Sequence, residues 1–301
     1  MTRAVVFAYH NVGVRCLKVL LAHGVDVALV VTHEDNPNET IWFESVAATA
    51  ALHGIPVATP ANPNRPIFLA QLEDCRADFL FSFYYRQMLH PAVLATARRG
   101  AYNMHGSLLP KYRGRVPVNW AVLHGERETG ATLHRMVEKP DAGEIVAQQA
   151  VPILPDDTAH EVFGKVTLAA EMALDKVLPA LVAGSAPHVM PDLKAGSYCR
   201  GRKPEDGRID WTQTAQQIHN LVRAVAPPYP GAFHDLPGGG RLRLLRTLLA
   251  PARAVLHPTP TLYRDGADTL VDCTDGRVLR VLEWDGEWDG TSPTPLTGRS
   301  D

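Results

Sequence analysis

Two side chains in the stretch AYNMH, residues 101–105, have the types and the spacing that acyl transfer requires. If this stretch is a β-strand, Asn103 and His105 project from the same face, because side chains alternate along a strand with a period of two. A side-chain amide can donate to an oxygen that becomes anionic, and an imidazole can exchange a proton with an attacking or leaving nitrogen. The same pair could instead cap the loop after the strand, and strand geometry alone does not separate the two interpretations.

A third candidate, Asp141, lies in the stretch KPDAG between two predicted strands. A carboxylate that faces an imidazole favours the protonated form of the ring and fixes its orientation. Asp is also a frequent turn residue beside Pro and Gly, so a purely structural role in the turn is the alternative.

The loop after the predicted strand carries three cations, Lys111, Arg113 and Arg115. The planar fork of an arginine matches phosphate and carboxylate oxygens, so these side chains could bind an anionic group. The alternative is that they form a solvated loop surface, and the sequence leaves both interpretations open.

Other residues nearby do not indicate a different chemistry. His124 and His134 are interpreted as a loop residue and a strand-face residue. Ser107 lies in HGSLLP, which lacks the Gly-x-Ser-x-Gly pattern of a nucleophilic serine, so covalent catalysis is not expected. No HExxH, paired-Asp or Cys/His motif predicts a metal site.

The elements that must position these residues are short apolar runs that alternate with amphipathic segments. Strands are predicted at 4–9, 25–32, 56–59, 79–83 and 101–105, and helices at 12–24, 43–54, 67–72 and 91–97. This alternation predicts an α/β fold with a Rossmann-like, doubly wound parallel sheet, whose ligand sites lie beyond the carboxyl ends of the strands. The first strand–helix turn, YHNVGV, lacks GxGxxG, so a dinucleotide site of the usual kind is not supported.

The second half of the chain has a different pattern. Segments 129–137 and 144–151 alternate like a strand pair, and a long amphipathic helix is predicted from about 159 to 183. Short strand-like runs separated by Gly, Pro and Asp then predict a small β-barrel-like domain. The predicted organisation is a catalytic domain over 1–190, a linker over 191–210 and a barrel domain over 211–301, with a leading helix at 214–225 and a disordered tail at 289–301.

Composition limits the class of protein. The 301 residues are 46% hydrophobic and 21% charged, with a formal net charge of −2, so no strong field for nucleic acid or membranes is expected. The cysteines are widely spaced without a CxxC motif, which is typical of free thiols in a reducing compartment. The N-terminal apolar run has the length of a strand, and no signal-peptide cleavage site follows it. A cytoplasmic protein without membrane insertion is therefore expected.

The stretch NMHGSLLPKYRGRVPVNW and the later PDAG resemble the central signature of the folate-dependent formyltransferases. The matching elements are Asn-x-His, Ser-Leu-Leu-Pro, Arg-Gly and Asp-Ala-Gly. LLPKYRGRVPVNW, FAYHN, FSFYYR and VRAVAPPYPGAF are most similar to one branch, the UDP-4-amino-4-deoxy-L-arabinose formyltransferase domain of the bifunctional polymyxin-resistance enzyme. The resemblance extends to about residue 235 and is weak from 240 onward.

This resemblance implies transfer of a formyl group from 10-formyltetrahydrofolate to the 4-amino group of UDP-4-amino-4-deoxy-L-arabinose, a step of lipid A modification. It implies that Asn103 holds the carbonyl oxygen, His105 transfers the proton, and Asp141 favours protonated His105. It also implies a small C-terminal OB-like barrel. The residues that match folate-binding positions are Gln87, through its backbone, Met88, Leu89, Arg115, Val137, Glu138, Lys139, Pro140 and Asp141.

Several alternatives remain at this point. The acceptor could be another nucleotide-linked 4-amino sugar, or initiator methionyl-tRNA, although the net charge of −2 disfavours a tRNA partner. A formyltetrahydrofolate hydrolase and a non-catalytic folate- or nucleotide-binding module are the other candidates. The resemblance predicts no oligomeric state, since the second, UDP-glucuronate-decarboxylating domain of the bifunctional enzyme has no counterpart in the sequence.

Overall fold

The computed structural model describes residues 2–236 and 240–296. The chain divides into two compact units, each of which combines segments that are distant in the sequence. The first unit contains Met1–Pro117, Glu128–Pro152 and Gly164–Arg200, and the second contains Val118–Arg127, Ile153–Phe163 and Gly201–Asp301. The last change of unit, after Arg200, falls inside the segment that the sequence predicts as a linker.

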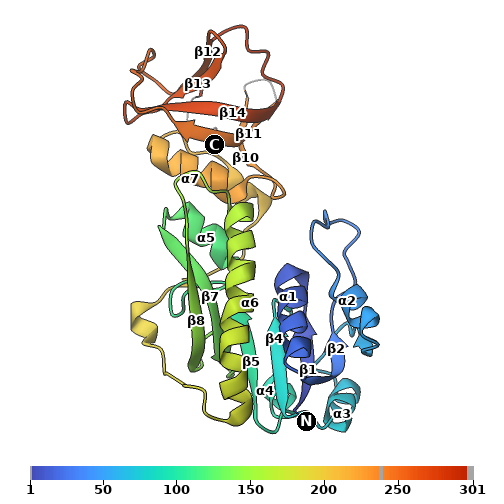
Figure 1. Cartoon of the computed structure of the whole chain (residues 1–301). Helices are drawn as coiled ribbons and strands as arrows, with labels where there is room; N and C mark the ends of the chain where they lie inside the picture. Colours follow the sequence, from blue (N-terminus) through green and yellow to red (C-terminus); the bar gives the residue numbers. More distant parts are fainter. Residues whose placement is uncertain (1, 237–239, 297–301) are drawn as a thin grey trace. The chain divides into compact units, whose positions relative to one another are not determined.

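The first unit is built on a sheet with strand order β3-β2-β1-β4-β5-β7-β8 (Figure 1). The strands from β3 to β5 pair in parallel, whereas β7 and β8 are antiparallel to their neighbours. The bounds are β1 Arg3–Ala8, β2 Asp26–Val31, β3 Val57–Ala58, β4 Phe79–Phe83, β5 Gly100–His105, β7 Glu128–Arg135 and β8 Ile145–Pro152. The prediction of an α/β fold with a Rossmann-like parallel sheet is confirmed, and the predicted strand pair extends the same sheet.

The helices of this unit pack apolar faces against buried strands. α1 buries Val12, Leu17 and Leu20 and ends before Gly24, whose φ of +68° is a backbone conformation that glycine adopts readily. The guanidinium of Arg15 donates to both carboxylate oxygens of Glu171 at 2.5 and 2.6 Å, which ties α1 to α6. The bounds are α1 His10–Ala22, α2 Val46–Leu52, α3 Pro66–Asp74, α4 Pro91–Leu94 and α6 Ala159–Ala183, of which the part from Gly164 onward belongs to this unit. Over the described ranges, no helix combines the length and the apolar character that crossing a bilayer requires.

A short ribbon adds to the first unit. β6 (Arg113–Gly114) pairs in parallel with β9 (Tyr198–Cys199), and a 3-10 turn at Leu193–Ala195 precedes β9. The ribbon therefore joins the loop after β5 to a segment far along the chain. The sequence did not predict it, because two-residue strands leave no periodic signal.

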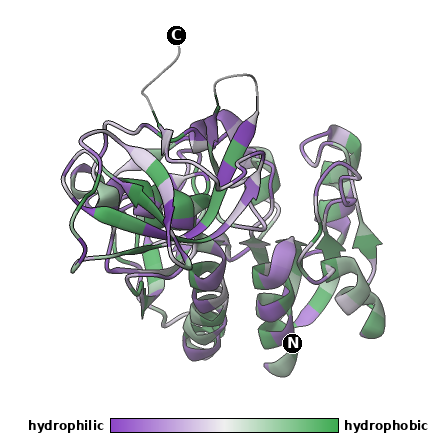
Figure 2. Cartoon of the chain, turned by 90° about the horizontal axis from the view of Figure 1, so that it is seen from above, coloured by the Kyte–Doolittle hydropathy of each residue, from purple (hydrophilic) through white to green (hydrophobic). Residues whose placement is uncertain are grey.

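The second unit contains an antiparallel sheet with strand order β10-β11-β14-β13-β12-β15, curled as in an OB-like domain (Figure 1). Its strands carry both hydrophilic and hydrophobic residues (Figure 2). The inner face packs with α7 around Trp211, Ile218, Leu244 and Val271. The bounds are α5 Pro117–Leu123, a 3-10 turn at Pro204–Gly207, α7 Ala215–Val225, β10 Ala232–Asp235, β11 Arg241–Leu249, β12 Thr261–Asp265, β13 Asp268–Asp272, β14 Val278–Gly286 and β15 Thr294–Pro295. α7 begins with a capping box, in which Thr214 and Gln217 each bond the backbone N–H of the other.

The C-terminal segment differs from the predicted disordered tail. β15 pairs with β12, and the indole N–H of Trp288 donates to Thr294 Oγ1 at 3.0 Å. Leu296 is only 1% exposed, because it packs into the core of the second unit. Burial of a few apolar side chains thus orders this part of the segment, and residues 297–301 lie outside the described residues.

Candidate active site

The last strand of the parallel part of the sheet, β5, presents the candidate catalytic pair. Asn103 and His105 lie at its carboxyl end, two residues apart, beside the end of β4. His105 is buried, with 6% of its surface exposed, whereas Asn103 is partly exposed. The pair therefore lies where parallel α/β sheets carry their ligand sites.

Asp141 joins this pair from the turn between β7 and β8. Its Oδ2 accepts the backbone N–H of Gly114 at 2.8 Å, while its Oδ1 lies 3.6 Å from Nδ1 of His105. The backbone of Asp141 has a φ of +50°, a left-handed conformation that is uncommon outside glycine, Asn and Asp. The structure thus brings the sequence-predicted Asn103, His105 and Asp141 into one cluster.

The surroundings of Asp141 favour its ionised form. Burial alone would raise the pKa of this carboxyl group, since burial disfavours the charge. The positive charge of His105, the neighbouring ring of His134 and the hydrogen bond from the backbone N–H of Gly114 outweigh burial and hold the pKa of Asp141 well below its usual range. The group is therefore a carboxylate throughout the neutral range.

His105 has one ring nitrogen committed to the protein. Its Nε2 lies 2.8 Å from the carbonyl oxygen of Tyr112. A carbonyl oxygen only accepts hydrogen bonds, so this geometry assigns the hydrogen to Nε2. Nδ1, which faces Asp141, is then the nitrogen at which His105 gains or loses a proton.

A second histidine, His134, completes the cluster. Its Nδ1 donates to the carbonyl of Arg135 at 3.0 Å, so Nε2 is left to accept the side-chain N–H of Asn103 at 3.1 Å. Nε2 also lies 3.5 Å from Asp141 Oδ1. The interpretation of His134 as an ordinary strand-face residue is incomplete: it does lie on a strand, but its ring orients the Asn103 amide.

The loop after β5 is held by close backbone contacts. A Cβ added to Gly114 would lie 2.2 Å from the carbonyl oxygen of Cys199, and its φ of +98° also favours glycine. Lys111 and Arg115 are exposed, as an anion-binding role would require, but Arg113 is 9% exposed, with its guanidinium 5.8 Å from the Tyr198 ring. A solvated surface role is thus excluded for Arg113.

The loop after β4 contains the predicted folate positions 87–89. The side chain of Gln87 donates to the carbonyl of Ala61 at 3.1 Å, so this side chain is already bonded within the protein. Met88 is 55% exposed, whereas Leu89 is 5% exposed and packs in the core of the first unit. Any contact of Leu89 with a ligand would therefore involve its backbone.

This loop is anchored at its start by His33. Nε2 of His33 accepts the backbone N–H of Arg86 at 3.0 Å, and its ring stacks on Tyr85 with centroids 4.1 Å apart. Burial, with a smaller contribution from the Arg86 charge, lowers the pKa of His33 to about 4. His33 is thus a neutral acceptor at physiological pH.

The remaining predicted folate positions, 137–140, precede Asp141 in the same turn. Val137 is 43% exposed, Glu138 and Lys139 are exposed, and Pro140 is partly exposed. These side chains are accessible to a ligand, in contrast to Leu89. Asp141 itself is the link between this turn and His105.

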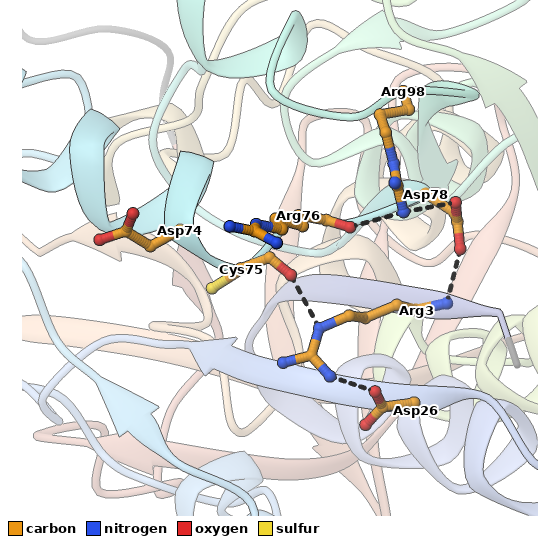
Figure 3. Close-up of a pocket in the computed structure, with 7 residues that line it drawn as sticks. All are labelled: Arg3, Asp26, Asp74, Cys75, Arg76, Asp78 and Arg98. Carbon is orange, nitrogen blue, oxygen red and sulfur yellow. Dashed lines mark hydrogen bonds and ion pairs between the residues drawn. The ribbon is translucent and has the colours of Figure 1, made fainter.

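A charged hollow lies at the opposite, amino-terminal ends of the parallel strands (Figure 3). Its ionic groups bind one another: Arg3 pairs with Asp26, its backbone N–H donates to Asp78, and Arg98 donates to Asp78 at 2.9 Å. Arg3 Nε and Arg98 also donate to the backbone carbonyls of Cys75 and Arg76. The hollow is therefore interpreted as a clamp on strand ends and not as the catalytic site.

Comparison with solved structures gives similar folds. The N-formyltransferase from Helicobacter canadensis, solved on complex with folinic acid and dTDP-3-aminofucose, has 20% identity and a TM-score of 0.72, over 93% of this chain and 99% of that one. A sugar 3N-formyl transferase solved with dTDP and 5-N-formyl-THF has 20% identity and a TM-score of 0.73, over 93% and 97%. HypX from Aquifex aeolicus with tetrahydrofolic acid has 17% identity and a TM-score of 0.65, over 98% of this chain but 46% of HypX. At these identities the likeness establishes the fold.

Family comparison is more specific. The family described as formyl transferase matches residues 12–178, a span that includes the candidate catalytic cluster. The family described as formyl transferase, C-terminal domain, matches residues 202–287. The first match alone covers more than half of the sequence, and the chain therefore belongs to the formyl transferase family.

Proposed function

We propose that this chain transfers the formyl group of 10-formyltetrahydrofolate to the 4-amino group of UDP-4-amino-4-deoxy-L-arabinose. The observation that carries the proposal is the cluster of Asn103, His105 and Asp141 at the carboxyl end of β5. Membership of the formyl transferase family supports the reaction class. The motifs LLPKYRGRVPVNW and VRAVAPPYPGAF support this branch of the family, whose product belongs to lipid A modification and polymyxin resistance.

Asn103 is the group that stabilises the developing charge. The folate co-substrate supplies an activated formyl group, and its transfer to an amine leaves tetrahydrofolate. The amide nitrogen of Asn103 carries two hydrogens, of which His134 accepts one, so one is left for the formyl oxygen as it becomes anionic. A single such donor contributes about 10²–10³ in rate.

His105 is the group that moves the proton. The attacking amine must lose a proton as its nitrogen bonds to the formyl carbon, and Nδ1 of His105 accepts it. The same proton is then returned to the folate nitrogen as its bond to the formyl carbon breaks. Asp141, 3.6 Å from Nδ1, stabilises the intervening imidazolium.

The proposed folate site uses the loop after β4 and the turn before Asp141. Gln87 and Leu89 would contribute backbone groups, since one side chain is bonded to Ala61 and the other is buried. Met88 and Val137 offer exposed apolar surface to a planar ring system. The exposed guanidinium of Arg115 suits a carboxylate of the folate. The exposed Glu138, Lys139 and Pro140 complete the proposed set with Asp141.

The identity of the amino sugar rests on the sequence motifs. The Helicobacter canadensis enzyme was solved with dTDP-3-aminofucose, and another similar structure is named a sugar 3N-formyl transferase. These names support a nucleotide-linked amino sugar as the class of acceptor. Another nucleotide-linked 4-amino sugar and initiator methionyl-tRNA are the alternative acceptors.

One assay tests these acceptors together. The purified chain is incubated with 10-formyltetrahydrofolate and, separately, with UDP-4-amino-4-deoxy-L-arabinose, dTDP-linked 4-amino sugars, dTDP-linked 3-amino sugars and initiator methionyl-tRNA. We expect the highest kcat/KM with the UDP-linked sugar. A higher kcat/KM with a dTDP-linked sugar or with the tRNA would overturn the assignment of the acceptor while preserving the reaction class.

A further inference from the structure

The segment from Gly196 to Cys199, which includes β9, forms backbone hydrogen bonds with the loop after β5. This loop contains Tyr112, whose carbonyl accepts the hydrogen of His105. The backbone N–H of Ser197 donates to the carbonyl of Pro110, and the N–H of Arg115 donates to the carbonyl of Cys199. A Cβ added to Gly196 would lie 2.1 Å from the carbonyl oxygen of Pro110, so the two segments are in close backbone contact. The loop after β5 is therefore shaped by residues more than eighty positions later.

Ser197 binds the backbone on both sides of Tyr112. Its hydroxyl oxygen accepts the N–H of Tyr112 at 2.8 Å, and its carbonyl oxygen accepts the N–H of Arg113 at 3.0 Å. Tyr112 has a φ of +56°, a left-handed conformation that is strained for a bulky residue. Such strain persists only where surrounding contacts enforce it. Ser197 supplies two of these contacts.

The strained peptide faces His105. The Tyr112 carbonyl, which accepts Nε2–H of His105, belongs to the peptide unit between Tyr112 and Arg113. The N–H of the same unit, that of Arg113, donates to the main-chain carbonyl of Ser197. Because the unit is planar, fixing its N–H also fixes the direction of its carbonyl. The next N–H, that of Gly114, holds Asp141. One short segment thus sets the positions of both His105 and its carboxylate.

We propose that Ser197 is a positioning residue for His105: its hydroxyl holds Tyr112 in the left-handed conformation, so that the Tyr112 carbonyl keeps the hydrogen of His105 on Nε2 and leaves Nδ1 to exchange protons. The importance of this for turnover rests on the proposed role of His105 as the proton-transfer group. Without the hydroxyl, the peptide unit before Tyr112 loses its bond to Ser197, and Tyr112 relaxes toward negative φ. Only the main-chain bond from the Arg113 N–H then restrains the Tyr112 carbonyl, which points at Nε2 for less of the time. The ring then populates the tautomer with hydrogen on Nδ1, which cannot accept a proton from the amine.

The direct test is the tautomeric state of His105 in the full chain. Ring ¹⁵N NMR shifts are recorded for wild type, Ser197→Ala and Ser197→Thr, with His105→Gln used to assign the resonance. Ser197 is exposed, so these substitutions leave the buried core in place. We expect the Nε2–H form of neutral His105 in wild type and Ser197→Thr, and a mixture in Ser197→Ala. Unchanged shifts in Ser197→Ala would overturn the proposal.

Kinetics provide the second measurement. We expect kcat for formyl transfer to fall roughly five- to tenfold in Ser197→Ala, with little change in KM, and to recover in Ser197→Thr. Ser185→Ala, which removes an exposed hydroxyl at the end of α6, is the matched control and should retain wild-type kcat. If Ser197→Ala does not fold, Ser197→Cys replaces it, because a thiol is a weak acceptor.

The two proposals fail in distinguishable ways. A tautomer change in Ser197→Ala, with no formyl transfer by wild type, would support the positioning role and overturn the proposed function. Normal transfer by wild type, with kcat and ring shifts of Ser197→Ala identical to those of wild type, would support the proposed function and overturn the positioning role of Ser197.

Discussion

Oδ1 of Asp141 lies 3.6 Å from Nδ1 of His105. The other ring nitrogen, Nε2, is bonded to the carbonyl of Tyr112. The negative charge is thereby placed against the nitrogen that must take up a proton. A carboxylate at this distance stabilises the imidazolium and orients the ring. This arrangement gives the cluster the properties of an acid–base site.

Replacing Asp141 by Asn removes the negative charge of the side chain and keeps its shape. The pKa of Asp141 is held below its usual range, so the group is ionised over pH 5–9 and does not itself produce a limb of the pH–rate profile there. Its removal takes away the negative charge that stabilises the imidazolium formed during proton transfer, so the plateau of the pH–rate profile should fall. Turnover of wild type and Asp141→Asn across this range is the measurement.

The choice of Asn also provides the control. Asn tolerates the left-handed conformation that Asp141 adopts, so the turn is preserved. A purely structural Asp141 would then give an unshifted profile at full rate, and that result would return the residue to a turn-forming role.

Asn103→Ala removes the proposed donor to the formyl oxygen. We expect a folded protein whose kcat falls by about 10²–10³, with a smaller effect on KM. Circular dichroism confirms folding, and steady-state kinetics give the two constants. A change confined to KM would show that Asn103 serves ground-state binding alone.

His134→Leu tests whether the second histidine orients Asn103. Leu cannot accept the Asn103 N–H, so the amide is free to rotate and kcat should fall roughly tenfold. His124→Leu, at an exposed position of the second unit, is the matched control and should leave kcat unchanged. Equal kcat values for the two variants would contradict the orienting role.

The lowered pKa of His33 predicts that the stability of the folded chain depends on pH. Its pKa is about 4 in the folded chain and about 6.5 when exposed, so between these values the unfolded state binds more protons. Stability should therefore decrease as pH falls from about 6.5 toward 4. In His33→Gln, which cannot titrate, that part of the decrease should vanish although the loss of stacking lowers stability overall.

Urea unfolding midpoints at pH 7.5 and pH 5 measure this effect. The difference between the two midpoints should be smaller in His33→Gln than in wild type. An identical difference in both proteins would show that His33 is protonated equally in the folded and unfolded states.

Local periodicity predicted the parts of the structure that depend on neighbouring residues. The period of two placed Asn103 and His105 on one face, and alternation of strands and helices predicted the parallel sheet that carries them. The 3.6-residue period predicted α6, from Ala159 to Ala183. Gly24 correctly marked the end of α1.

Contacts between distant segments could not be predicted in this way. His134 faces Asn103 because β7 pairs with β5 in a particular register, and a shift of one residue would turn its ring to the other face. The carbonyl of Tyr112 and the hydroxyl of Ser197 act through backbone geometry that no side-chain pattern reports. The order of residues 294–296 likewise depends on a core supplied by the rest of the second unit.

The most direct test of the account compares wild type with His105→Ala for release of tetrahydrofolate with and without an amino sugar. We predict equal amounts of tetrahydrofolate and N-formylated sugar, no release without the amine, and a rate lower by about 10²–10⁴ in a folded His105→Ala variant. Release of tetrahydrofolate at the same rate without any amine would show a hydrolase. Near-normal transfer by folded His105→Ala would contradict the assignment of His105 as the proton-transfer group.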